Sequence, residues 1–184
     1  MTTDWTVRAI TRATLPVLLA LTLVELLSGL VLGRFEATLL QYPTLLVLVP
    51  VTIGTAGNLG SVLASRLSSA FHLGTLEFGA DDTLFGNALA TVLLALTTFP
   101  LIGAGGWALA GVTSGTDLPL STVLVVAVSS GAALAVLAVV VTFVATYAAY
   151  RLELDPDDVV IPVVTNTCDV LGVVVLFAVV QVVV

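Results

Sequence analysis

The chain has 184 residues, of which 59% are hydrophobic and only 9% are charged, and its formal net charge is −7. A soluble domain carries roughly 25% charged residues, so this composition excludes a soluble globular protein. All basic residues are arginine, and a lysine-free acidic composition of this kind is typical of halophile proteins from high-salt cytoplasms.

Five apolar stretches follow one another along the chain. No charge occurs within 37–65, 83–116 or 118–150, and each of these gaps exceeds the roughly 20 residues that a spanning helix needs. The first and last stretches are interrupted only by Glu25 and Asp169. We therefore expect an all-α integral membrane protein, multi-pass in the cell membrane, with five transmembrane helices near 13–33, 42–67, 83–110, 119–149 and 159–183.

The arginines predict the orientation of these spans. With the N-terminus in the cytoplasm, four of the five lie inside: Arg8, Arg12, Arg66 and Arg151. Only Arg34 then lies outside, so the positive-inside rule predicts a cytoplasmic N-terminus and an external C-terminus. Trp5 and Tyr42 fit interfacial anchors, and Asp81 and Asp82 suit the start of the third span, where negative charge favours the helix dipole.

Small and polar residues recur at intervals of three and four on the second span: Gly54, Gly57, Asn58, Ser61, Ser65 and Ser68. One interpretation is close helix packing, which small residues permit. The other is that Pro50 kinks or breaks the helix, so that freed carbonyls face water or an ion. Asn58 is the one amide of this stripe, and its carbonyl oxygen is a candidate ligand for a hard cation.

The last span carries a similar pattern, in which Pro162, Thr165, Asn166 and Asp169 share one helix face. A carboxylate at bilayer depth costs roughly 2.5–3.5 kcal/mol, so an intramembrane Asp usually serves a pathway or a partner. An ion pathway is the first interpretation. The alternative is a structural role, with Asp169 hydrogen-bonded to a neighbouring Ser or Asn.

Three further residues are weaker candidates for a functional role. Glu25 is interpreted first as a hydrogen-bonding group toward a neighbouring helix, with a second ion ligand or a proton carrier as the alternative. His72 has no second His or Cys and is not expected to be a ligand, and Cys168 is expected to pack. An intramembrane aspartyl protease needs two deep aspartates, and His72 at a span end does not suit a Ser–His dyad, so we do not expect an enzyme.

Two long motifs resemble a known family. The run GNLGSVLASRLSSAFHLG with Pro50 upstream, and the run LDPDDVVIPVVTNTCDVLG, are similar to the second and last spans of MgtE-type magnesium channels and their eukaryotic solute-carrier relatives. The resemblance implies a pore at a twofold axis in which Asp169 holds a hydrated Mg²⁺. It also assigns Asp155 to the cytoplasmic mouth and assigns to the pore lining Gly54, Gly57, Asn58, Ser61 and Thr165.

The expected function is therefore a divalent-cation (Mg²⁺) channel or transporter with Asp169 from two subunits in its pore. The alternative is a non-conducting subunit, or one half of a heterodimer. The bilayer and a second copy are the expected partners, with no nucleic acid. Asn166 joins the ion-facing groups, and Asp155 and Asp158 would concentrate cations at the mouth.

We expect residues 1–184 to form a single MgtE-like transmembrane domain, without the cytoplasmic N-terminal and CBS domains of bacterial members. Two further positions depart from the bacterial pattern. Val62 stands where many members have Gln, and Ile161 stands where many have a small or polar residue.

Overall fold

The computed structural model describes residues 6–75, 82–113 and 115–184, with the side chains of Ala9 and Ala13 excepted, so the predictions for Trp5 and Asp81 lie outside the described residues. Within these ranges the chain is helical. The helices are α1 (Val7–Arg34), α2 (Glu36–Gln41), α3 (Pro43–His72), α4 (Asp82–Thr113), α5 (Leu120–Arg151) and α6 (Pro156–Val183).

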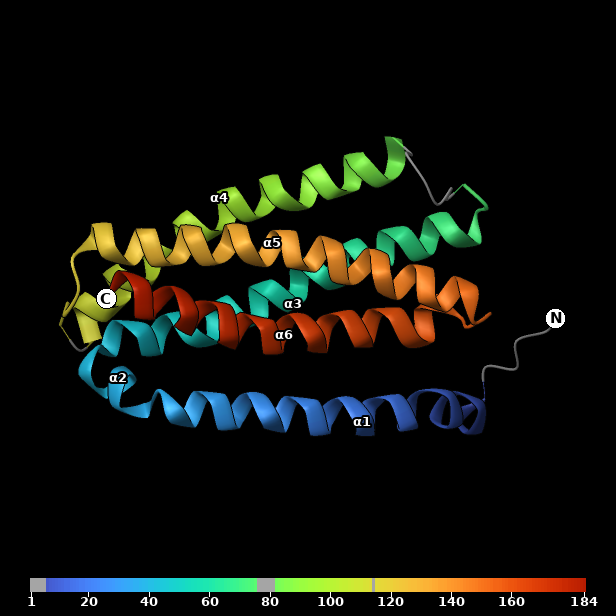
Figure 1. Ribbon diagram of the computed structural model, residues 1–184, viewed down its shortest axis with the longest axis horizontal. Helices are drawn as coiled ribbons and strands as arrows, with labels where there is room; N and C mark the ends of the chain where they lie inside the picture. Colours follow the sequence, from blue (N-terminus) through green and yellow to red (C-terminus); the bar gives the residue numbers. More distant parts are fainter. Residues whose placement is uncertain (1–5, 76–81, 114) are drawn as a thin grey trace.

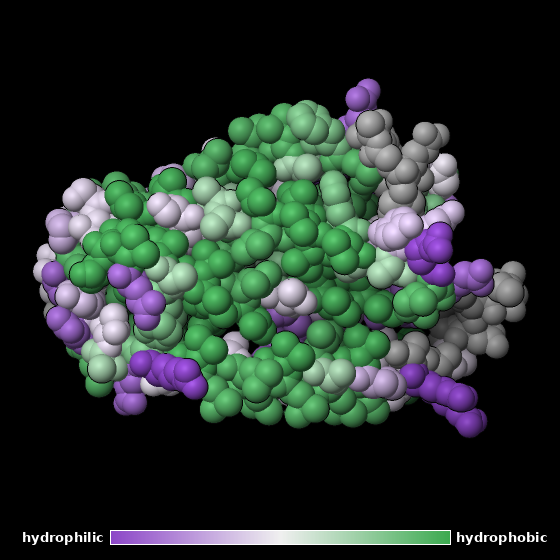
Figure 2. Space-filling model, in the orientation of Figure 1, coloured by the Kyte–Doolittle hydropathy of each residue, from purple (hydrophilic) through white to green (hydrophobic). Residues whose placement is uncertain are grey.

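Five of these helices are long and apolar enough to cross a membrane. Figure 2 shows the corresponding surface, a broad hydrophobic belt with hydrophilic residues gathered at its two ends. The predicted all-α fold with five spans is confirmed. The helices extend past the predicted limits because the helical backbone continues into polar sequence, as α3 does to His72.

The helices α3 to α6 form a packed bundle, and α1 lies along its outside (Figure 1). The most extensive packing joins α3 to α6, which run in opposite directions. The largest fully buried side chains include Phe99, Phe177 and Leu134. Of the described elements, α1 packs only against α6 and the short α2.

Glycines bring the helices of the bundle close together. A Cβ on Gly131 of α5 would lie 2.2 Å from Cγ of Phe99. On α3, a Cβ on Gly60 would lie 2.7 Å from Val164 and 2.8 Å from Sγ of Cys168. Cys168 is buried at this contact, as expected for a packing residue. Small residues thus serve close packing here, as they commonly do between membrane helices.

Neither of the two prolines singled out in the sequence breaks its helix, contrary to one expectation. The helix α3 is continuous through Pro50, and α6 is continuous through Pro162. A proline removes only the hydrogen bond of its own nitrogen, and neighbouring helices can stabilise the rest of the ladder. The continuous helices keep the residues that follow each proline in register along one face.

The sequence did not predict α2, which has only 6 residues. Leu39 of α2 is buried in the same core as Leu45 and Phe177. The start of α3 lies nearby. Oδ1 of Asp117, in the connection between α4 and α5, accepts hydrogen bonds from the backbone N–H and the hydroxyl of Thr44. These contacts fix the end of the bundle opposite to Asp155.

Candidate ion site

Asp169 lies midway along α6, where it faces α3. Its Oδ1 atom is buried and accepts no hydrogen bond of good geometry among the described residues, although the backbone of Gly57 lies beside the carboxylate. The structural alternative, a hydrogen bond from a neighbouring Ser or Asn to this oxygen, is therefore not found in the described chain. An unpaired buried carboxylate oxygen is costly, so the arrangement favours a bound cation or a proton as its partner.

Gly57 of α3 makes room for this carboxylate. A Cβ on Gly57 would lie 2.2 Å from Oδ1 of Asp169 and 3.0 Å from its Cγ. No side chain larger than hydrogen fits unless the carboxylate moves. The small-residue stripe of the second span and the polar face of the last span therefore meet at this contact.

Thr165 and Asn166 precede Asp169 by one turn of α6. The Thr165 hydroxyl donates to the carbonyl of Ile161 at 2.8 Å, and the Asn166 amide donates to the carbonyl of Pro162 at 2.9 Å. Both side chains are half-buried. The oxygen atoms of both side chains keep free lone pairs, which could accept hydrogen bonds from the water shell of a cation, and one N–H of Asn166 also remains free.

The remaining predicted residues of α3 lie on a more open surface. Gly54 is exposed, and a Cβ there would meet nothing within 4 Å. Asn58 is exposed, and its backbone carbonyl accepts a hydrogen bond from the hydroxyl of Ser61 at 3.1 Å. Within one chain, Gly57 is thus brought against Asp169, whereas Gly54 and Asn58 line the exposed face of the same helix.

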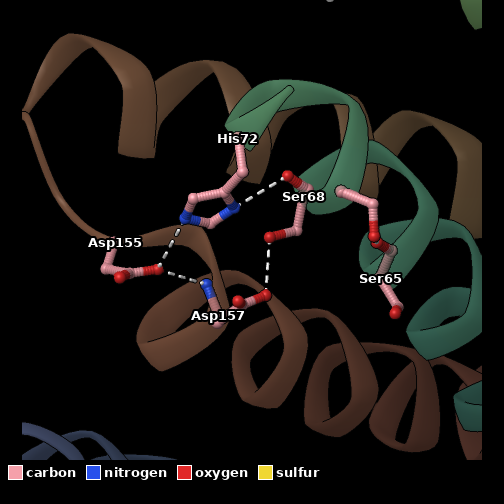
Figure 3. A network of polar contacts seen from close by, with 6 residues as sticks. Ser65, Ser68, His72, Asp155 and Asp157 are labelled. Carbon is pink, nitrogen blue, oxygen red and sulfur yellow. Dashed lines mark hydrogen bonds and ion pairs between the residues drawn. The ribbon is translucent and has the colours of Figure 1, made fainter. Parts of the chain in front are cut away.

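A second polar group gathers where the end of α3 meets the start of α6 (Figure 3). His72 Nε2 lies 3.7 Å from Oδ1 of Asp155, which also accepts a hydrogen bond from the backbone N–H of Asp157 at 3.0 Å. The hydroxyl of Ser68 donates to Oδ1 of Asp157 at 2.6 Å. One ligand atom each from His72, Asp155 and Asp157 lies within 4.8 Å of the others, an arrangement that could hold a metal ion.

This end group differs in membership from the sequence-based prediction. Asp157 and His72 belong to it, whereas Asp158 is not a member. The sequence gives a partial signal, because Ser68 and His72 are four residues apart and share a helix face. Their proximity to Asp155 requires the antiparallel packing of α3 and α6, which spacing along one helix does not reveal.

Glu25 also behaves differently from its first interpretation. The described structure gives its side-chain carboxylate no hydrogen bond to a neighbouring helix; only its backbone carbonyl accepts one, from the hydroxyl of Ser28. The Glu25 side chain is exposed.

A comparison with known protein families identifies the family of the chain. The MgtE family, described as a divalent cation transporter, matches residues 49–179. This range contains most of α3, all of α4 and α5, and α6 as far as residue 179, Asp169 included. No solved structure matches the chain. Because the family match covers more than half of the sequence and includes both motif-bearing helices, the chain belongs to the MgtE family of divalent cation transporters and is a multi-pass membrane protein.

Proposed function

We propose that the protein is a Mg²⁺ channel or transporter that acts as a homodimer, with Asp169 of both copies facing one pore. The observation that carries this proposal is Oδ1 of Asp169, which is buried at membrane depth with no hydrogen-bond partner among the described residues. A divalent cation on the pore axis would supply the missing partner for two such oxygens at once.

The chemistry of the surrounding groups suits Mg²⁺. This ion requires six oxygen ligands in octahedral geometry, gives up water reluctantly, and is usually held by one or two carboxylates with several retained waters. Thr165 and Asn166 offer oxygen acceptors on the same face as Asp169, where they would bind those waters. Nitrogen and sulfur ligands, which transition metals prefer, do not accompany Asp169 on this face; Cys168 packs against Gly60 instead.

The exposed polar surface supports a second copy. Gly54 and Asn58 are exposed at membrane depth on α3, and polar groups are not stable against lipid. A twofold axis beside α3 and α6 would bury this surface and turn it into a pore lining. Gly54, Gly57, Asn58 and Ser61 from each copy would then line the wall opposite to Thr165 and Asp169.

The arginine distribution places the His72–Asp155–Asp157 group at the cytoplasmic mouth. There, Asp155, Asp157 and the neighbouring Asp158 would concentrate cations at the pore. With little bound Mg²⁺, repulsion between the two copies of this acidic segment would splay the ends of α6. Bound Mg²⁺ would draw them together, which would make the mouth a gate.

Ion uptake into proteoliposomes containing only this purified chain tests the proposal. We expect uptake of Mg²⁺ to exceed that of Na⁺ by orders of magnitude, with Ca²⁺ and Mn²⁺ measured in parallel to define selectivity. Native mass measurement of the same preparation should give a dimer. A folded dimer that conducts none of these ions would contradict the proposal and would favour a non-conducting subunit or one half of a heterodimer.

A further inference from the structure

Glu25 is a carboxylate at membrane depth that the ion site described above does not include. It lies in α1, the helix that packs only against α6 and α2 among the described elements. An ionised side chain in a spanning helix normally faces a cavity or pairs with another charge. The described part of the chain gives the Glu25 carboxylate neither a hydrogen bond nor an ion pair with a basic residue, so its partner must be sought on the side that it faces.

The helical register of α1 turns Glu25 toward α6. The partly buried residues of α1 recur at intervals of three and four and mark the side that packs on the bundle: Val17, Leu21, Ser28 and Leu32. Glu25 falls between Leu21 and Ser28 in this series, four residues after the first and three before the second. Residues at such intervals share one face of a helix.

A ring contact then fixes the level of Glu25 along α6. Phe35, directly after α1, stacks on Phe177 of α6 with ring centroids 4.0 Å apart. The two helices run in the same direction (Figure 1). At 1.5 Å per residue, Glu25 lies about 15 Å before Phe35 and Asp169 about 12 Å before Phe177, so the two carboxylates are level within one helical turn.

The surface around this position is open rather than sealed. Figure 2 shows hydrophilic atoms in a narrow opening between α1 and the rest of the bundle, inside the hydrophobic belt. Glu25 is exposed, and its level along the bundle is that of Asp169. Two carboxylates of like charge at this depth repel one another unless a cation lies near both.

We propose that Glu25 is a selectivity-determining residue of the Asp169 site, adding a second carboxylate in each subunit that favours a divalent over a monovalent cation. This inference rests on the proposed transport function and extends it from α3 and α6 to α1. Glu25 acts across the water shell of the ion, whereas Asp169 is the central ligand. Because a divalent ion gains twice the Coulomb energy of a monovalent ion from the added charge, loss of Glu25 reduces discrimination more than it reduces conduction.

The test compares three substitutions in proteoliposomes, with Mg²⁺ and Na⁺ uptake measured for each. Glu25→Gln keeps the shape and the hydrogen-bonding capacity but removes the charge, and we expect the Mg²⁺/Na⁺ uptake ratio to fall by roughly tenfold. Glu25→Asp restores the charge and should recover most of the ratio. Asp82→Asn removes an exposed carboxylate from the start of α4 and should leave the ratio unchanged.

The outcomes distinguish a failure of the inference about Glu25 from a failure of the proposed transport function. If Asp169→Asn abolishes Mg²⁺ uptake but Glu25→Gln leaves the ratio at the wild-type value, the inference about Glu25 is wrong and the proposed function stands. If Glu25→Asp, which keeps the charge, lowers the ratio as much as Glu25→Gln does, the charge does not account for the discrimination and the inference again fails. If Asp169→Asn conducts normally, the proposed function itself fails.

Folding is checked independently by thermal unfolding of the same proteins. Added Mg²⁺ should raise the melting temperature of the wild type, and the rise should be smaller for Glu25→Gln because the ion is held less tightly. A purely structural Glu25 would lower the melting temperature without Mg²⁺ and leave the Mg²⁺-dependent rise intact.

Discussion

The two acidic regions of α6 differ in how their oxygen atoms are satisfied. At the helix start, Asp155 and Asp157 are exposed, and they already accept hydrogen bonds from the backbone of Asp157 and the hydroxyl of Ser68. Midway along the helix, Oδ1 of Asp169 is buried and has no partner among the described residues. A carboxylate in water with protein donors needs no ion, whereas a buried and unpartnered carboxylate does.

This difference suggests a division of labour between the two regions. The start of α6 would attract ions and respond to their concentration, binding them weakly because water and protein donors compete. The Asp169 region would hold the ion during passage, because few other groups there satisfy its charge. Substitutions in the two regions should therefore differ in size of effect as well as in kind.

The largest effect is expected from Asp169→Asn. This change keeps the shape of the side chain but removes two charges per dimer, so Mg²⁺ uptake should fall by orders of magnitude. Folding should survive or improve slightly, because a charge no longer has to be buried. Uptake into proteoliposomes, with thermal unfolding of the same preparation, measures both; a folded dimer with near wild-type uptake would remove Asp169 from the mechanism.

A smaller but still large effect is expected from Gly57→Ala. The added Cβ would lie 2.2 Å from Oδ1 of Asp169, so the carboxylate must move, and we expect Mg²⁺ uptake to fall by about tenfold or more. Gly105→Ala is the matched control, since a Cβ there meets nothing within 4 Å. Equal uptake by the two variants would show that the position of the Asp169 carboxylate does not matter.

A moderate effect is expected at the start of α6. The double substitution Asp155→Asn with Asp158→Asn removes part of the charge repulsion that would open the mouth at low Mg²⁺. We expect flux to depend less on the Mg²⁺ concentration, because fewer carboxylates remain to repel one another at low Mg²⁺ and to bind the ion at high Mg²⁺. An unchanged Mg²⁺ dependence of conductance in the double variant would show that this region is no gate.

Features that belong to a single helix could be predicted from the sequence. Charge-free stretches predicted the five long helices, because a spanning helix has a required length and few tolerated charges. Polar spacing placed Asp169 with Thr165 and Asn166 on one face of α6, which α6 retains as a continuous helix. These are properties of single helices, and periodicity reports them directly.

Contacts between helices could not be predicted from the sequence in the same way. The approach of Gly57 to Asp169, and of His72 to Asp155, depends on how α3 and α6 are rotated about their axes, which the spacing within either helix leaves open. The hydrogen bond expected from Glu25 to a neighbouring helix is not found among the described residues, and its level relative to Asp169 again depends on how α1 and α6 pack. The helix α2 was missed because a helix of 6 residues has too few turns to show a period.

The smallest effect on uptake is expected from cysteine labelling of a loop, which tests the orientation of the chain in the membrane. On a Cys168→Ser background, a cysteine at position 153 should react only with reagent supplied from the cytoplasmic side, because the arginine distribution predicts that this loop lies inside. Uptake should stay near its starting value, because residue 153 lies in the exposed loop before α6. Labelling of position 153 from outside would reverse the roles of the two ends.

The most direct measurement is a structure of the purified protein with Mn²⁺ in place of Mg²⁺, recorded so that anomalous scattering locates the ion. The account predicts a symmetric dimer with a strong peak on the twofold axis, between the two Asp169 carboxylates. That peak should vanish in Asp169→Asn, while any weaker peak near Asp155 remains. A dimer whose Asp169 side chains face away from the axis, or one with ions at Asp155 alone, would contradict the central claim.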